Sequence, residues 1–286
     1  MKNIFLTFLF LFGISAFIYS QNKILKPDRL KHQKVYTSIE DALNEPLKVY
    51  KLDLNFQGIE VIPEKIIKLI NLQELELMGN KIKYLSANIC MFDNLELLNI
   101  SNNKLKFLSA EIGSLKNLKK LLVIDNELLE LTNEIYELDN LEELDLRSNK
   151  LKELPPEIGK LKKLKWLNLW NNKINTLPSE IRHITSLKYL GLKDNKLTKL
   201  PSNFSGLNNL EELNLSGNEL SSIPLAIGSL INLVILDLSF NKLKFLPKEI
   251  GKLKKLKWLI LNGNLISHDE IQNIKKLLPK CKVIYD

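Results

Sequence analysis

The chain has 286 residues, of which 45% are hydrophobic and 26% are charged. This composition is typical of a globular protein and excludes a disordered tail. The net charge of +8 comes largely from lysine, which suggests an affinity for acidic surfaces without identifying one. At this length the chain can form one large domain or two small ones.

The first twenty residues have the layout of a secretory signal peptide. Lys2 is followed by an apolar run over residues 4–18, and small or polar residues precede Gln21. The run is shorter than the roughly 20 residues that a membrane-spanning helix needs. We therefore predict a signal peptide over residues 1–20, cleaved before Gln21, and no stable membrane insertion.

Residues 21–46 are predicted to form an N-terminal segment and a cap. Thr37 precedes Glu40 by three residues, which is the spacing of a helix capping box. Ile39, Ala42 and Leu43 would form the apolar side of a short helical turn. Such a turn can cover the exposed end of the core that follows.

One pattern of 23 residues, LxxLxLxxNxLxxLPxxIxxLxx, recurs over residues 47–266 without an insertion or a deletion. A weaker first copy has Gln57 at the asparagine position, which brings the number of units to ten. Each unit can bury its leucines only against a neighbour, so the repeat predicts a solenoid. The asparagine position recurs at Asn80, Asn103, Asn126, Asn149, Asn172, Asn195, Asn218, Asn241 and Asn264.

Each unit is predicted to contain a short parallel strand followed by a short helix or helical turn. The LxxLxL block alternates with the period of a strand, and the second half opens at Pro, Ser or Thr, which favour a helix start. Strands lie about 4.8 Å apart and helices up to about 10 Å, so the stack must curve. The expected fold is an α/β horseshoe with the parallel sheet on its concave face and the helices on its convex face.

The repeated asparagines are predicted to have a structural role. Where the chain turns after each strand, its backbone donors and acceptors are buried, and an amide side chain can satisfy both kinds. The stacked amides therefore need no ligand.

Residues 267–286 are predicted to cap the C-terminal end of the stack. Ser267 and Glu270 repeat the capping-box spacing, and Asp269 takes a position that is apolar in the other copies. A helix to about Leu278, followed by a strand around residues 283–285, would cover the last unit of the core.

The repeat resembles that of bacterial leucine-rich-repeat proteins of the 23-residue LPxxIGxL type. The lead-in YTSIEDALNEPLKVYKLDL and the ending IKKLLPKCKVIYD further resemble secreted leptospiral members of this family. The resemblance covers residues 36–286 and departs from the pattern at Gln57, at Phe204 and at residues 90–92. It implies a non-catalytic recognition surface, and the secreted spirochaetal members are regarded as candidate binders of host cell-surface or matrix molecules.

The sequence offers no catalytic or cofactor motif after residue 20. Phosphate-loop, zincin, hydrolase-elbow and CxxC motifs do not occur. His32, His183 and His268 fall in separate parts of the predicted solenoid and cannot converge on one site. Cys90 and Cys281 are about eight repeats apart, which excludes a disulfide between them. We therefore expect no enzymatic activity, no metal site and no cofactor.

Large side chains lie between the leucines in the stretch LKWLNLW, residues 164–170. If the leucines are buried, Trp166 and Trp170 lie on the opposite side of the strand and face solvent. Trp170 also falls beside two cations, Arg147 and Lys193. Aromatic and Arg side chains are typical of binding hot spots. We predict a partner-binding surface on the concave face that consists of Glu143, Arg147, Trp166, Trp170, Tyr189, Ile235, Trp258 and Ile260.

A structural role for the same aromatic residues is the alternative. Trp and Tyr favour strands, neighbouring rings can stack, and cations beside Trp170 can satisfy its ring. The segment EIGKLKKLKWL occurs at both 157–167 and 249–259, so one of the tryptophans can be explained by duplication.

Two lysine clusters follow the helical turns of the convex edge. An anionic glycan could bind them, although cations are also favoured near exposed helix ends by the helix dipole. Nucleic acid is not expected to bind an exported protein. The clusters are Lys160, Lys162, Lys163 and Lys165, and Lys252, Lys254, Lys255 and Lys257.

These patterns predict a secreted or cell-surface interaction module, monomeric or weakly dimeric, that binds an extracellular or host macromolecule through its concave face in adhesion or virulence. The alternative is a periplasmic or envelope scaffold that binds the bacterium's own components. An enzyme with a polar site at Glu143 and Asp145, and a cytosolic regulator, are less favoured.

Overall fold

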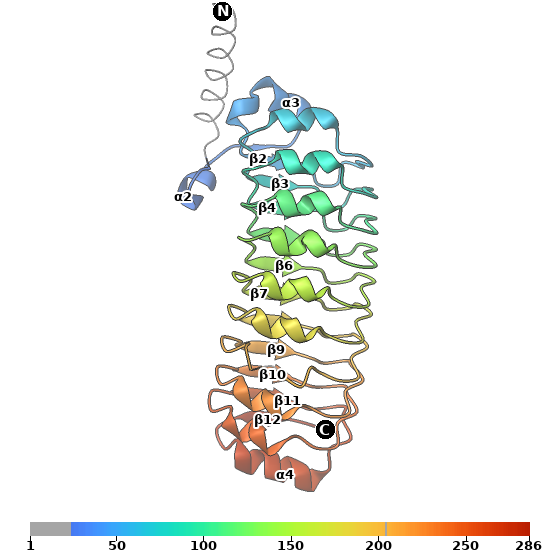
Figure 1. Ribbon diagram of the computed structural model, residues 1–286, viewed down its shortest axis with the longest axis vertical. Coiled ribbons are helices and arrows are strands. Elements are labelled where there is room, and N and C mark those ends of the chain that lie inside the picture. The colour runs from blue at the N-terminus through green and yellow to red at the C-terminus, as the bar shows by residue number, and fades with distance from the viewer. Residues whose placement is uncertain (1–23, 204) are drawn as a thin grey trace, which may run out of the picture.

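The computed structural model describes residues 24–203 and 205–286. This part of the chain forms one twelve-stranded parallel sheet in which each strand pairs with the next in sequence (Figure 1). The predicted α/β solenoid with an open parallel sheet is thereby confirmed. The predicted signal peptide, residues 1–20, lies outside the described residues, and so does Phe204.

The strands are short and follow one another at the repeat interval. Each pairing keeps its register, so that Leu213 pairs with Leu236 and Leu236 with Leu259. The cap strands are β1 (Val35–Tyr36) and β12 (Lys282–Ile284), and the repeat strands are β2 (Lys51–Asp53), β3 (Glu74–Glu76), β4 (Leu97–Asn99), β5 (Lys120–Leu122), β6 (Glu143–Asp145), β7 (Trp166–Asn168), β8 (Tyr189–Gly191), β9 (Glu212–Asn214), β10 (Ile235–Asp237) and β11 (Trp258–Ile260).

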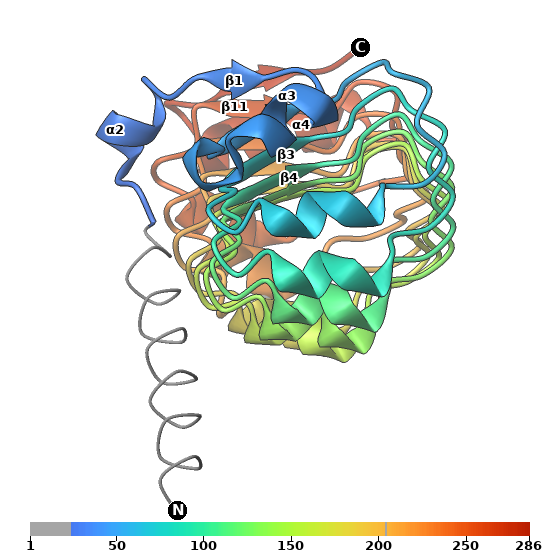
Figure 2. The same cartoon turned by 90° about the horizontal axis from the view of Figure 1, so that it is seen from above.

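The convex side carries short 3₁₀ helices. Each of these helices has five residues, and hydrogen bonds join residues three apart. One example runs from the Leu69 N–H to the Ile66 carbonyl. Between β8 and β9 the described residues contain no helix. Seen down the stack, the units overlie one another and the helices gather on one side (Figure 2). They are η2 (Glu64–Lys68), η3 (Ala87–Met91), η4 (Ala110–Ser114), η5 (Asn133–Glu137), η6 (Pro156–Lys160), η7 (Ser179–His183), η8 (Leu225–Ser229) and η9 (Lys248–Lys252).

Both ends of the sheet carry helical segments. At the N-terminal end these are α2 (Pro27–Leu30), α3 (Ile39–Asn44) and η1 (Pro46–Lys48), and at the C-terminal end α4 (His268–Leu277). The Ser267 hydroxyl accepts from the Glu270 N–H at 3.3 Å, as the spacing predicts. At α3 the predicted cap at Thr37 is wrong by one residue, because Ser38 is the N-cap and accepts from the Asp41 N–H. Strand β12 likewise begins one residue earlier than predicted.

The asparagine ladder joins each unit to the preceding one. The Asn172 Nδ2 donates to the carbonyls of Leu169 in its own unit and Leu146 in the unit before, both at 3.0 Å. Its Oδ1 accepts from the Leu151 N–H at 3.1 Å. The two bonds between units recur at all nine asparagines. In the first unit, the Gln57 Nε2 donates instead to the Thr37 carbonyl of the cap.

The residue before each ladder position has a left-handed backbone, with φ between 52° and 71°. Glycine adopts this conformation freely, Asn and Asp more readily than most residues, and a bulky residue at a cost of about 1–2 kcal/mol. The Phe240 ring lies against Gly263 of the next unit, where an added Cβ would meet the ring at 2.5 Å. The column is Phe56, Gly79, Asn102, Asp125, Ser148, Asn171, Asp194, Gly217, Phe240 and Gly263.

Candidate functional site

The outward side chains of the sheet form two rows across the concave face, one from the first and one from the third residue of each strand. In the first row, Trp166 pairs in register with Glu143 on one side and Tyr189 on the other. Farther along the same row, Ile235 pairs with Trp258. The constant spacing thus brings the predicted residues onto one surface in the order that the repeat predicts.

Trp166 and Tyr189 form a flat aromatic platform. Their ring centroids lie 3.7 Å apart and their planes differ by 9°. The Tyr189 ring lies over Gly191, where an added Cβ would be 2.6 Å from the tyrosine Oη. Burial raises the pKa of Tyr189, and the carboxylates of Glu212 and Asp145 raise it further. Trp166 keeps 41% of its surface exposed, so one side of the platform remains open to solvent.

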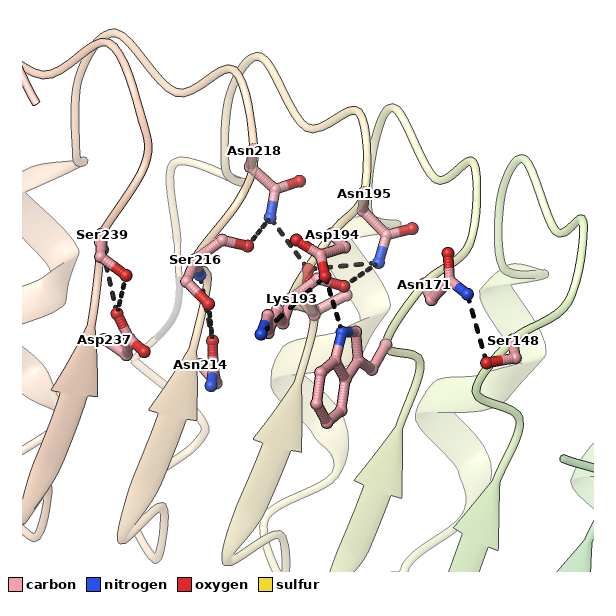
Figure 3. Close-up of polar contacts among 12 residues, drawn as sticks. Ser148, Asn171, Lys193, Asp194, Asn195, Asn214, Ser216, Asn218, Asp237 and Ser239 are labelled. Atoms are coloured by element: carbon pink, nitrogen blue, oxygen red, sulfur yellow. Dashed lines mark hydrogen bonds and ion pairs between the residues drawn. The ribbon is translucent and has the colours of Figure 1, made fainter. Parts of the chain in front are cut away.

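Trp170 is fixed by polar contacts with the next unit. Its Nε1 donates to the Asp194 Oδ2 at 2.9 Å, and the Lys193 Nζ lies 4.4 Å from its ring centroid. Figure 3 shows Lys193 and Asp194 side by side beyond their strand. The second predicted cation has another partner, since the Arg147 Nε lies 3.2 Å from the Asp145 Oδ2. Trp170 is thus held by Asp194 and Lys193, whereas Trp166 is held by stacking on Tyr189.

A second apolar group lies near the C-terminal end of the face. Trp258 is 40% exposed and sits beside Ile235, and the Lys282 Nζ lies 4.6 Å from its ring centroid. Ile260 pairs in register with Asp237. Strands β9 and β10 lie between Tyr189 and Trp258, and β9 contributes Glu212 to the first row.

A second ladder of polar side chains, not predicted from the sequence, lies at the third residue of the strands. The Asp237 Oδ1 accepts from the N–H and the hydroxyl of Ser239, and the Asn214 Oδ1 does the same with Ser216 (Figure 3). Asx side chains commonly bond to the N–H two residues ahead in this way. Asp or Asn between the two leucines of LxL was the available signal. The members are Asp53, Asn99, Asp145, Asn168, Asn214 and Asp237.

Several carboxylates of the concave face have raised pKa values. Burial is the main cause at Glu76, Asp145 and Glu212. Neighbouring carboxylates add to it: Glu76 is near Asp53, and Glu212 is near Asp237. Burial disfavours the ionised form, and a like charge does the same. These groups therefore lie in a partly desolvated surface that carries excess negative charge.

The first lysine cluster is occupied by contacts within the protein. Lys160 lies 4.0 Å from the Tyr136 ring centroid, and the Lys162 Nζ donates to the carbonyls of Gly159 and His183. Lys163 donates to the Asn140 Oδ1, and Lys165 forms an ion pair with Glu142 at 2.7 Å. In the second cluster, Lys255 donates to the Asn232 Oδ1. These contacts account for the first cluster without an anionic ligand.

The polar pair Glu143 and Asp145 is held in two separate ion pairs. Lys120 binds Glu143 at 2.6 Å, and Arg147 binds Asp145. In residues 24–203 and 205–286, no three His, Cys, Asp or Glu side chains are grouped to hold a metal ion, and no helix has the length and apolar character to cross a membrane. Both cysteines are free and partly buried, and burial raises the pKa of the Cys281 thiol to about 11.

Family models of leucine-rich repeats match four stretches of the chain. The model described as Leucine rich repeat matches residues 139–197 and 162–220. Leucine Rich repeats (2 copies) matches residues 208–248, and Leucine Rich Repeat matches residues 94–115. Comparison with curated proteins gives no match.

Solved structures of leucine-rich-repeat proteins resemble the chain over most of its length. A leucine-rich-repeat protein of Leptospira interrogans is 29% identical with a TM-score of 0.64, and the match covers 88% of this chain and 99% of that one. The ectodomain of the Arabidopsis thaliana receptor kinase GASSHO1/SCHENGEN3 is 31% identical with a TM-score of 0.66, covering 75% and 27%. The functional domain of InlJ from Listeria monocytogenes is 25% identical with a TM-score of 0.69, covering 84% and 49%.

The coverage differs between these relatives. The chain spans nearly all of the leptospiral protein but less than half of each of the other two. The family models, the leptospiral match and the parallel sheet agree with one another. The chain is a bacterial leucine-rich-repeat protein that resembles those of Leptospira.

Proposed function

We propose that this protein is an exported, non-catalytic module that binds an extracellular or host cell-surface or matrix protein through its concave face. The leucine-rich-repeat fold supports a protein-interaction module. The observation that carries the proposal is the exposed aromatic surface on a rigid sheet, with Trp166 and Trp258 each about two-fifths exposed. Aromatic side chains dominate the binding energy of many interfaces.

Two of the similar structures support a protein as the partner. The GASSHO1/SCHENGEN3 ectodomain was solved in complex with CASPARIAN STRIP INTEGRITY FACTOR 2. Another similar structure, that of PEPR1 with AtPEP1, is 26% identical to the chain with a TM-score of 0.68. The fold thus carries protein ligands in other receptors, and a partner of the same class fits the surface of this chain.

The layout of residues 1–20 supports export of the protein. Binding to a host surface molecule would give the exported protein a role in adhesion or virulence. A surface-exposed protein should be cleaved by protease added to intact cells, whereas a periplasmic scaffold should not. Protein that resists added protease on intact cells and is released with the periplasm would favour the scaffold. A glycan remains a secondary ligand for the second lysine cluster, where it would contact Lys252, Lys254 and Lys257.

The test is a binding screen against extracellular receptors, matrix proteins and glycans. A variant with Trp166, Trp170 and Trp258 changed to Ala should lose more than about tenfold in affinity, since hot-spot side chains contribute about 2 kcal/mol or more each. Its far-ultraviolet circular dichroism spectrum should show the same secondary structure as that of the parent, because these side chains lie outside the leucine core.

The matched control changes three exposed aromatic residues that lie off the concave sheet. Tyr84, Phe107 and Phe245 are 59%, 50% and 57% exposed, and each follows a ladder asparagine by four residues. Their Ala variant should retain full affinity. Equal losses in the two triple variants, or unchanged affinity in the tryptophan variant, would exclude the concave face as the binding surface.

A further inference from the structure

The concave face carries the opposite charge to the chain as a whole. The chain has a net charge of +8. The two outward rows of strands β2 to β12, however, contain seven carboxylates and only three lysines. The carboxylates are Asp53, Glu74, Glu76, Glu143, Asp145, Glu212 and Asp237, and the lysines are Lys51, Lys120 and Lys282.

The cations of this face are already engaged. Lys51 pairs with Glu74 at 2.9 Å, Lys120 pairs with Glu143 at 2.6 Å, and Lys282 lies over the Trp258 ring. The adjoining Arg147 pairs with Asp145. Within the described residues, the remaining four carboxylates have no Lys, Arg or His nitrogen within 4.0 Å. These are Asp53, Glu76, Glu212 and Asp237.

Two of these four carboxylates, which have no ion-pair partner, lie between Tyr189 and Trp258. Glu212 pairs in register with Tyr189 on one side and Ile235 on the other. Asp237 is the third residue of the next strand, and both carboxylates are half-buried. Burial raises the pKa of Glu212 and the charge of Asp237 raises it further, so the two carboxylates interact unfavourably in the free protein. A cation bound between them would relieve this repulsion, because it favours the ionised form of both.

The tryptophans of this face already take cations from the protein itself. Lys193 lies over Trp170 and Lys282 over Trp258, at 4.4 and 4.6 Å from the ring centroids. Such contacts are attractive because the face of an aromatic ring carries partial negative charge. Among the described residues no lysine or arginine lies over the stacked pair Trp166–Tyr189. This platform, next in register to Glu212, is therefore open to a cation from outside.

We propose that the concave surface from Trp166 to Trp258 binds a polypeptide segment with closely spaced lysine or arginine side chains. Glu212 and Asp237 receive one cationic head group by hydrogen bonds and charge. The Trp166–Tyr189 platform receives a second, or the methylene stem of the first. The inference rests on the proposed function and names the chemistry of the partner, which the basic charge of the whole chain does not suggest.

The test uses the full chain with a fluorescein-labelled nonapeptide of arginine, the same peptide of lysine, and an uncharged citrulline nonapeptide. Fluorescence anisotropy should give binding of the two cationic peptides that weakens as salt is raised, and none of the citrulline peptide. The double variant Glu212→Gln with Asp237→Asn should bind the arginine peptide at least about tenfold more weakly, since hydrogen bonds to a charged group are stronger than those to a neutral one.

The control for this variant removes the same charge elsewhere. Glu130 and Glu153 are exposed on the loops that follow the ladder, outside the concave rows. Glu130→Gln with Glu153→Gln should leave the affinity within about twofold, because distant surface charges are largely screened in salt. Equal losses in the two double variants, or no binding of either cationic peptide, would overturn the proposal.

Two further outcomes separate this inference from the proposed function. A protein partner whose binding is lost with the tryptophan variant but is unaffected by Glu212→Gln with Asp237→Asn would retain the proposed function and refute a basic ligand. Concentration-dependent self-association that disappears in the same double variant would assign the acidic surface to the lysine-rich side of a second copy, and would also overturn the proposal.

Discussion

The buried leucines and the concave rows lie one residue apart along the same strands, yet they differ in residue type and in burial. At the central position of strands β6 to β9 every residue is leucine and fully buried: Leu144, Leu167, Leu190 and Leu213. At the preceding position the same strands carry an acid, an indole, a phenol and an acid: Glu143, Trp166, Tyr189 and Glu212.

The difference follows from the alternation of side chains in a strand. Each of these leucines packs against its equivalents in the units before and after, so any change in its shape must be accommodated by two neighbours. A side chain of the concave rows faces solvent and is confined only by side chains of the adjacent strands. The fold therefore separates the residues that hold the stack together from those that can specify a partner.

The comparison is tested most strongly by Ala substitution at adjacent residues. Leu167→Ala should lower the free energy of unfolding by about 2–5 kcal/mol, because it removes a fully buried side chain and leaves a cavity. Trp166→Ala should lower it by only about 0.5–1.5 kcal/mol, mainly through the lost stacking on Tyr189. Equilibrium urea unfolding measures both changes. Similar costs at the two positions would contradict the separation.

The asparagine ladder predicts a smaller loss of stability. Asn172→Ala leaves the Leu151 N–H without its acceptor, at a cost of about 1–3 kcal/mol. The Leu146 and Leu169 carbonyls still accept from Asn149 and Asn195. The control is Asn175→Ala in the same unit, an exposed position where the change should stay within about 0.5 kcal/mol. If the midpoints of urea unfolding for the two variants coincide, the ladder does not hold the units together.

The smallest effect concerns charge on the concave face. Asp237→Asn should keep both bonds to Ser239, because Asn214 makes the same pair of bonds with Ser216. Loss of the Asp237 charge should lower the pKa of Glu212 towards its ordinary value, while stability changes by less than about 1 kcal/mol. Carboxyl ¹³C NMR titration measures the pKa.

The sign of the pH dependence follows from the raised pKa of Glu212. A raised folded-state pKa means that the stability contributed by this group is complete below its unfolded pKa and is lost as pH rises through the folded value. Asp237→Asn should therefore narrow the pH interval between the unfolded and folded pKa values of Glu212, over which this stability is lost. A pKa of Glu212 that stays unchanged or rises in the variant would show that the two carboxylates do not interact.

Periodicity predicted the fold because it reports on packing, the dominant contribution to this architecture. A spacing of 23 residues fixes which leucines stack and which strands pair, and the register of Trp166 with Tyr189 follows from counting alone. Helix caps were less predictable, since Thr37 and Ser38 both have a hydroxyl and the helix begins at Ile39, directly after Ser38.

The chemistry of the concave face could not be predicted in the same way. Stacking of Trp166 on Tyr189 depends on side-chain torsions and on the space above Gly191, and neither is periodic. Whether Glu212 has an ion-pair partner depends on which lysines are already engaged by other side chains. The net charge of the chain averages over both faces, so it suggests an acidic partner where the concave surface is itself acidic.

The two cap strands bear on how such a molecule can change its size in evolution. Because β1 and β12 occupy the outer positions of the sheet, a gain or loss of length occurs inside the stack, in whole units of the repeat. Every duplicated unit widens the concave surface by one strand and repeats the strand pairing that already joins neighbouring units. The recurring segment EIGKLKKLKWL, which provides both Trp166 and Trp258, has the form that such an event leaves behind.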